Sequence, residues 1–297
     1  MIKYLAVLFA VKTLSWLPRR AAYAIADFVA ALGYLARRGQ RQNVKANLRQ
    51  VMGPDAPDKE ISRAARRIFR NVMRYYADLV LLPRLDIQRF WEQEVVMHGV
   101  DNLLEAVQSG RGVIMASAHY GTPELVGQTL KAVNVDALVI TEPLEPPAMS
   151  NLVHRLRGSH GQDCRPVGFS TIKEAMRRLR RGGAVAIAFD RDIQGTGRLL
   201  PFFGRDTRLP VGAVQLALRT GAQIITAFAV RHDAHHFEGW IDPPLTVSVT
   251  GDGERDLREN TLRLVARLEE HLRRDPGHWA VTERVWPDQG QRAEHTA

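Results

Sequence analysis

From about residue 100 onward, short apolar runs alternate with segments of helical periodicity, and this alternation constrains the fold more than any other feature of the chain. The runs are rich in β-branched and aliphatic residues and cover 113–118, 135–141, 184–189 and 222–230. The helical patterns between and after them cover 123–133, 147–158, 171–181, 211–220 and 255–273. Strands that alternate with helices build an α/β fold, so we predict a central mixed sheet flanked by helices.

The part of the chain before this alternation is helical in pattern. Residues 40–82 form two periodic segments that are separated by Gly53-Pro54, a pair that ends helices. No stretch rich in Pro, Gly or Ser divides the 297 residues. We therefore expect residues 1–297 to form a single domain, with the N-terminal helices packed on it.

The first fifty residues concentrate positive charge. They hold nine Lys and Arg residues and one acid, Asp27, so they carry a net charge of +8 while the whole chain carries +9. They also hold two apolar stretches, 4–17 and 21–36, each interrupted by a charge and shorter than the roughly 20 residues that span a bilayer. This pattern favours helices that lie in an anionic membrane interface. A buried helix pair and a nucleic-acid-binding arm are the alternatives.

The run "VIMASAHYGTPELVG" (113–127) is the first candidate site. His119 follows a predicted strand, and Glu124 begins the next predicted helix. Active sites of α/β folds gather at the carboxyl ends of strands, and a carboxylate beside an imidazole makes it a better general base. Spacing alone also permits a histidine that is hydrogen-bonded to backbone and an acid that merely favours a helix N-terminus.

The run "AIAFDRDIQGTGRLLPFFG" (186–204) is the second candidate site. Asp190, Arg191 and Asp192 follow another apolar strand, where they form either a solvated turn or a second wall of the site at His119. Gly195 and Gly197 lack the third glycine of a dinucleotide-binding fingerprint.

Other reactive residues fit a functional role less well. Cys164 is the only cysteine, which excludes an internal disulfide and fits a reducing compartment, and Ser117 lacks the G-x-S-x-G turn of a nucleophilic serine. Three histidines in "RHDAHH" (231–236) are more typical of a solvated turn than of a metal site. We expect neither a metal nor a redox cofactor.

Three ordered blocks carry a family resemblance. "SAHYGTPELVG", the run from "FDRDIQGTGRLLPFFG" to "LALRTGAQII", and the late "PGHWAVTERVWP" resemble the bacterial lipid A biosynthesis acyltransferases. That family includes lauroyl and myristoyl transferases and phosphatidylinositol mannoside acyltransferases. "EPLEPP" (142–147) lacks the arginine that lipid A enzymes usually carry there, so the resemblance leans towards the phosphatidylinositol mannoside branch.

The resemblance implies a glycerolipid acyltransferase-like fold and an activity. A fatty acyl group would move from acyl-CoA or an acyl carrier protein, as co-substrate, to a hydroxyl of a membrane glycolipid. His119 would be the base and Glu124 its carboxylate partner, while Asp190 would orient His119 or bind the acceptor. The remaining expected substrate contacts are a phosphate for Arg191 and Arg198 and an acyl groove for Phe202 and Phe203.

Two alternatives to this function stay open at the level of sequence. A lipid or thioester hydrolase would use the same His119–Glu124 pair on water, and a non-catalytic membrane-binding relative would keep the fold alone. In each case we expect the protein at the cytoplasmic face of the cell membrane, bound peripherally or shallowly inserted, without contact to nucleic acid.

Overall fold

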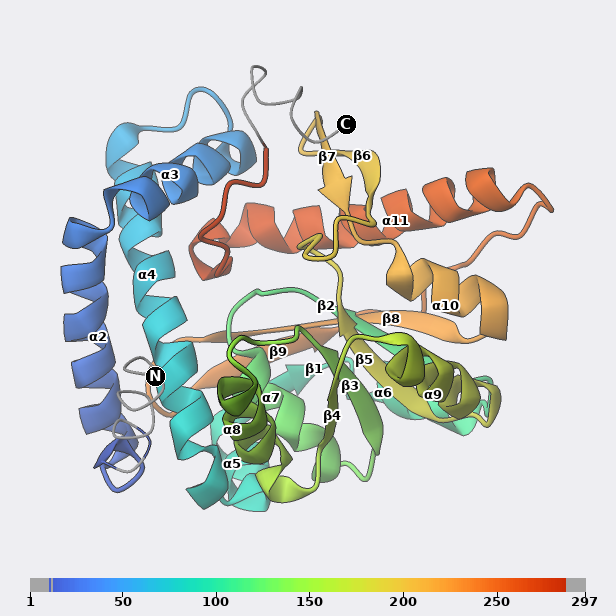
Figure 1. Ribbon diagram of the computed structural model, residues 1–297, viewed down its shortest axis with the longest axis horizontal. Helices are drawn as coiled ribbons and strands as arrows, with labels where there is room; N and C mark the ends of the chain where they lie inside the picture. The colour runs from blue at the N-terminus through green and yellow to red at the C-terminus, as the bar shows by residue number, and fades with distance from the viewer. Residues whose placement is uncertain (1–10, 12, 287–297) are drawn as a thin grey trace.

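A seven-stranded mixed sheet forms the centre of the computed structural model, which describes residue 11 and residues 13–286. Its strands lie in the order β1 (Val95–His98), β9 (Phe237–Ile241), β8 (Gln223–Arg231), β2 (Val113–Ser117), β5 (Ala184–Ala188), β3 (Ala137–Thr141) and β4 (Asp163–Pro166). Neighbouring strands are parallel except β8 and β9. The predicted α/β class and mixed sheet are therefore confirmed (Figure 1).

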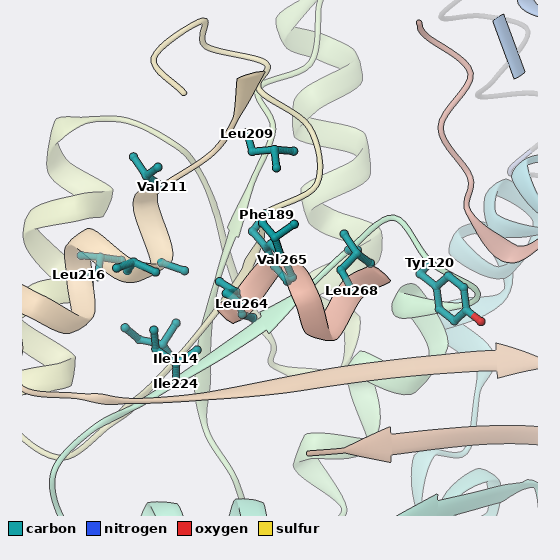
Figure 2. Close-up of a cluster of buried hydrophobic side chains, with 14 of the residues drawn as sticks. Ile114, Tyr120, Phe189, Leu209, Val211, Leu216, Ile224, Leu264, Val265 and Leu268 are labelled. Carbon is teal, nitrogen blue, oxygen red and sulfur yellow. The ribbon is translucent and has the colours of Figure 1, made fainter. Parts of the chain in front are cut away.

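Helices cover both faces of this sheet. One face packs against α9 (Phe169–Arg180), α10 (Gly212–Thr220) and α11 (Gly253–Arg274), whereas α6 (Val100–Gln108) covers the other. Figure 2 shows the first of these cores, where Ile114 and Ile224 from the sheet lie beneath Leu216 of α10 and Leu264 of α11. The alternating side chains of β2 explain both cores, because Ile114 joins one and Met115 joins the other.

A third apolar cluster lies beyond the carboxyl ends of the strands. It is built from α5 (Ile87–Glu94), α7 (Pro123–Gln128), α8 (Pro147–Arg157) and the end of α4 (Asp58–Leu81). Figure 1 shows α4 passing along this side of the sheet as the longest element of the N-terminal part.

Two further N-terminal helices pack around α4. Small residues on α2 (Arg19–Ala36), including Ala22, Ala26 and Ala30, are buried and let it approach α4 closely. The outer face of α2 leaves five large apolar residues exposed: Ile25, Phe28, Val29, Leu32 and Leu35. Among residues 13–286, no helix is both long enough and apolar enough to cross a membrane. Most of the expected apolar segment 4–17 lies outside the described residues.

The chain returns from α11 to the N-terminal helices. Asn47 of α3 (Arg38–Met52) donates to the Glu283 carbonyl at 2.7 Å and accepts from the Val285 backbone N–H at 3.1 Å. These hydrogen bonds join the N-terminal helices to the C-terminal segment, so the two ends of the described chain are held together.

A two-stranded hairpin, β6 (Arg198–Phe202) and β7 (Arg205–Leu209), projects from the sheet towards α11. Phe203 and Gly204 form its turn with positive φ angles of 49° and 72°. Phe202 is fully buried and its ring stacks on Trp286, with centroids 5.2 Å apart. The hairpin is thus anchored by aromatic packing.

We predict that Phe202→Ala lowers the free energy of unfolding by about 3–5 kcal/mol, because it removes a fully buried ring from a packed cluster. Urea unfolding followed by tryptophan fluorescence measures this loss. Leu199→Ala on the same strand is the control: its side chain is exposed, and we expect a change within about 0.5 kcal/mol. Equal effects of the two substitutions would contradict the anchoring role of Phe202.

Candidate active site

The loop after β2 carries His119 and is held from two sides. The His119 carbonyl accepts from the Ala280 N–H at 2.7 Å, and the Gly121 N–H donates to the His278 carbonyl at 2.8 Å. Gly121 has φ of +71°, and a Cβ there would lie 1.7 Å from the Ala229 carbonyl oxygen. Only glycine fits, so the turn after His119 is fixed by close contact with β8 and the C-terminal segment.

Asp190 is the carboxylate that meets His119. It follows β5, the neighbour of β2, so both residues leave the sheet at the same edge. Its Oδ1 lies 2.9 Å from His119 Nδ1, while Oδ2 accepts from the His119 backbone N–H and the Trp279 indole N–H, both at 3.0 Å. Of the two sequence interpretations, the structure agrees with the one in which Asp190 forms a second wall of the site at His119, and the contact between the two side chains is direct.

The electrostatics of Asp190 favour its ionised form. Complete burial acts to raise the pKa of this carboxyl, but the charge of His119 and the hydrogen bonds from His119 and Trp279 outweigh it. The pKa of Asp190 therefore lies below its ordinary value. An ionised Asp190 keeps the proton of the neutral His119 ring on Nδ1 and leaves Nε2 as the basic nitrogen.

Glu124 does not take the position that the sequence led us to expect beside His119. Pro123 starts α7, and the buried Glu124 side chain meets Arg157 of α8 instead, with its Oε1 at 2.8 Å from Nε and 2.5 Å from a terminal nitrogen. The Tyr75 hydroxyl donates to the same Oε1 at 2.5 Å. The expectation that Glu124 hydrogen-bonds His119 is thus wrong for this structure, because a buried arginine binds it and Asp190 occupies Nδ1.

Tyr75, Glu124 and Arg157 form one charge-compensated unit. Burial and the charge of Glu124 raise the pKa of Tyr75 well above its ordinary value, so the phenol stays a proton donor. Burial alone lowers the pKa of Arg157, but Glu124 and Tyr75 raise it by more. The guanidinium therefore stays charged inside the protein, where it is paired with Glu124.

A cavity of about 660 Å³ opens beside these groups. His119, Glu124 and Arg191 line it at the edge of the sheet, and His119 keeps 30% of its side chain exposed there. Most of the remaining wall is apolar, including Met97, Leu103, Met115, Leu130, Val133, Val139, Ile140, Leu144 and Val153. An apolar cavity with a histidine at its polar edge suits a long hydrocarbon chain whose reactive end meets the histidine.

The structure does not bring every expected substrate contact to this cavity. Arg191 lines it and reaches Glu142 at 3.3 Å and Glu283 at 3.1 Å. Arg198 instead lies at the surface and pairs with Glu254. Phe202 and Phe203 are absent from the cavity wall that the described residues form, because the hairpin packs on α11 and on two tryptophans. The expected acyl groove under "RLLPFFG" is therefore wrong.

Three contributors to the site were not foreseen. Trp279 belongs to the late block that was noticed, but nothing in that block identifies its indole as a donor to Asp190. Tyr75 and Arg157 reach Glu124 across 49 and 33 positions of the chain, and no local pattern marks them.

The remaining reactive residues are held in other ways. Cys164 lines the cavity, but burial raises the pKa of its thiol to about 12. Ser117 donates its hydroxyl proton to the Ala227 carbonyl at 2.7 Å. The three histidines of the 231–236 turn face Glu238, Glu94 and Asp233, and residues 13–286 contain no cluster of three or more His, Cys, Asp or Glu residues placed to hold a metal.

Asp190→Asn tests the histidine pairing. One amide group cannot accept at both of its ends, so its NH₂ would face either the His119 ring or the two N–H donors at Oδ2. By analogy with other buried His–Asp pairs we expect turnover to fall by about 10³–10⁴-fold. Asp206→Asn, which changes an exposed carboxylate on β7, is the control and should retain activity.

The same variant has a defined pH dependence. A lowered pKa means that ionised Asp190 stabilises the fold fully above its unfolded-state pKa of about 3.9, and that this contribution is lost as pH falls through the folded-state value. The difference in unfolding free energy between wild type and Asp190→Asn should therefore shrink as the pH falls below about 4. A difference that kept growing below about pH 4 would contradict the ionised state.

Residues 1–287 match the family described as bacterial lipid A biosynthesis acyltransferase. The chain is 27% identical over 271 residues to a phosphatidylinositol mannoside acyltransferase of Mycolicibacterium smegmatis, covering 87% of this chain and 84% of the relative. It is 26% identical over 265 residues to the protein of that name from Mycobacterium tuberculosis, covering 85% and 79%. The chain thus belongs to the bacterial lipid A biosynthesis acyltransferase family and is an acyltransferase.

Proposed function

We propose that the protein transfers a fatty acyl group from an acyl thioester, either acyl-CoA or an acyl carrier protein, to a sugar hydroxyl of a membrane glycolipid precursor. The carrying observation is the His119–Asp190 pair at the edge of a largely apolar cavity. The relatives named phosphatidylinositol mannoside acyltransferase favour an acceptor of that type over lipid A.

The reaction follows from the tautomer of His119. With the Nδ1 proton donated to Asp190, Nε2 accepts the proton of the acceptor hydroxyl. The oxygen attacks the thioester carbonyl carbon, the C–O bond forms, and the C–S bond breaks. The thiolate leaves and takes up the proton from the His119 imidazolium, which restores the neutral base.

No metal or redox step is needed in this scheme. The thioester arrives already activated, and acyl transfer to a hydroxyl involves no change in oxidation state. The co-substrate is therefore the acyl thioester itself, and the protein contributes a base and a cavity for the chain.

Glu124 is proposed to act on the same cavity without touching the histidine. Its pairing with Arg157 ties α7 to α8, which together form part of the wall that would enclose the acyl chain. Because both partners are largely buried, removing one leaves a charge without a counterion and is expected to disturb this wall. Glu124 therefore has a positioning role in this proposal.

His119→Ala should lower kcat by about 10²–10⁴-fold while the protein stays folded, because the general base is lost. Mass spectrometry of glycolipid products formed from a purified acceptor and an acyl thioester measures the rate. Cys164→Ala is the matched control, since it removes a cavity-lining thiol that stays protonated and should leave turnover nearly unchanged.

A double variant tests whether Asp190 is the partner of the base His119. The double variant His119→Ala/Asp190→Ala should be little slower than His119→Ala alone, because the two side chains act as one unit. Near-normal turnover of the His119→Ala variant would contradict this mechanism. Release of free fatty acid in place of acylated glycolipid would favour the hydrolase alternative.

The place of action is proposed to be the cytoplasmic face of the cell inner membrane, with peripheral attachment. The exposed side chains of α2 at 25, 28, 29, 32 and 35 follow helical spacing and form one apolar stripe. A basic N-terminal segment beside such a stripe suits the surface of an anionic membrane.

Phe28→Ser/Leu32→Ser should weaken binding to vesicles that contain phosphatidylglycerol by at least about tenfold, since each buried side chain contributes about 1.5–3 kcal/mol. Vesicle co-sedimentation measures the affinity, and added salt should weaken but not abolish wild-type binding. The control Phe169→Ser/Val249→Ser removes exposed apolar side chains elsewhere on the surface. If this control loses as much affinity as the α2 variant, the stripe is not the contact surface.

A further inference from the structure

A second cavity, of about 450 Å³, lies between α2, α4 and the turn after β8. Five arginines and two aspartates contribute to its wall: Arg20, Arg67, Arg70, Arg74, Arg231, Asp27 and Asp233. The wall of this cavity is rich in charged residues, whereas the wall of the cavity at His119 is largely apolar.

The cavity is separated from the candidate active site by α4. Arg67, Arg70 and Arg74 face the second cavity, whereas Tyr75 and Leu79 of the same helix face the first. The mechanism proposed above uses none of the arginines on this side.

Only part of the positive charge in the second cavity is compensated. Arg74 binds Asp27 through two hydrogen bonds of 2.7 and 2.6 Å, and Arg67 pairs with Asp275. Arg20 and Arg70, by contrast, form no hydrogen bond or ion pair with any residue in the described part of the chain. Two guanidinium groups are thus available to an anion.

Neighbouring positive charges affect the pKa of Arg70. Partial burial and the charges of Arg74 and Arg67 lower the pKa of this guanidinium, and only Asp27 acts in the opposite direction. A negatively charged ligand would relieve this repulsion.

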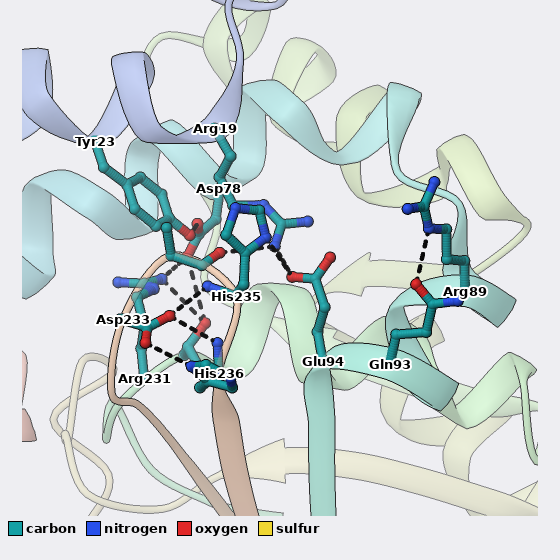
Figure 3. Close-up of polar contacts among 12 residues, drawn as sticks. Arg19, Tyr23, Asp78, Arg89, Gln93, Glu94, Arg231, Asp233, His235 and His236 are labelled. Atoms are coloured by element: carbon teal, nitrogen blue, oxygen red, sulfur yellow. Dashed lines mark hydrogen bonds and ion pairs between the residues drawn. The ribbon is translucent and has the colours of Figure 1, made fainter.

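Arg231 provides a second, independent sign of a ligand. Its side chain is 2% exposed and lines the cavity. It donates from one terminal nitrogen to Asp78 and to Thr122, and Figure 3 shows Arg231 beside Asp78 and Tyr23. Its Nε is buried and has no hydrogen-bond acceptor among the described residues. A buried donor without an acceptor is destabilising, so the site lacks one acceptor atom.

We propose that this cavity binds a phosphate group, as a monoester or diester, with Arg20, Arg70 and Arg231 as its principal contacts. Planar guanidinium groups match phosphate oxygens in both geometry and charge. The phosphate of a phospholipid headgroup fits the location, because Ala24 and Asp27 on the cavity wall adjoin Phe28 of the exposed α2 stripe. Soluble phosphate esters share the same chemistry.

The first test removes charge. Arg20→Gln/Arg70→Gln should weaken phosphate binding by about tenfold or more, because charge-assisted hydrogen bonds to the phosphate are lost. The matched control is Arg63→Gln/Arg258→Gln, which removes two exposed arginines outside the cavity. Calorimetry with inorganic phosphate and with glycerol 3-phosphate forms one arm, and co-sedimentation with phosphatidylcholine vesicles containing phosphatidylglycerol forms the other.

The second test fills the cavity while keeping every charge. Ala24→Trp places a large ring at the exposed cavity wall, and Ala31→Trp on the same helix, outside the cavity, is its control. A built site predicts that both cavity variants lose binding relative to their controls, whereas diffuse attraction predicts that Ala24→Trp binds normally.

The two arms distinguish the source of the phosphate. A loss confined to vesicles identifies a lipid headgroup, and a loss that extends to the soluble esters identifies a site open to free phosphate. If the cavity variants match their controls in both arms, the proposal is wrong. None of these readouts depends on acyl transfer, so the outcome is independent of the proposed enzymatic function.

Discussion

The buried carboxylate of Asp190 is the interaction on which the candidate active site depends. Its two oxygens accept from the His119 ring, the His119 backbone and the Trp279 indole, so one side chain joins the ends of β2 and β5 to the C-terminal segment. A buried carboxylate is costly without such partners. The hydrogen bonds that offset the cost of burying Asp190 are therefore the same bonds that fix the position and the tautomer of His119.

The alternation of strands and helices predicted the α/β class and a central sheet. It left open whether Asp190 lies in a solvated turn or beside His119, because alternation alone does not decide which strands become neighbours. Local pattern was less informative about short or polar elements. The edge strands β1 and β4, with four residues each, were not foreseen, nor was β9. Their pairing depends on partners that are distant in the chain, which periodicity within a short window does not reveal.

The position of Glu124 shows why spacing could not settle the site. Four residues separate it from His119, and its short distance in sequence suggested a direct pair. The turn at Gly121 and the helix start at Pro123 direct the carboxylate towards α4 and α8, where Arg157 and Tyr75 bind it. The partner of a charged residue is decided by which counterion is buried beside it, and Arg157 lies 33 positions away. Phe202 was misassigned for a similar reason, since its tryptophan partner, Trp286, lies near the end of the chain.

The two cavities on either side of α4 differ in whether their charged side chains have partners, and this difference indicates what kind of ligand each cavity can bind. At the first, Glu124 is paired with Arg157, so this carboxylate is compensated where it adjoins the apolar wall. At the second, Arg20 and Arg70 form no hydrogen bond or ion pair with the described residues, and Arg231 has one donor unused. Neutralising residues were within reach, because Asp27 and Asp233 line the same wall but are engaged by Arg74 and His236. A surface that keeps positive charge in a concave site, beside a helix with an apolar outer face, has the two properties that recognition of a phospholipid headgroup requires.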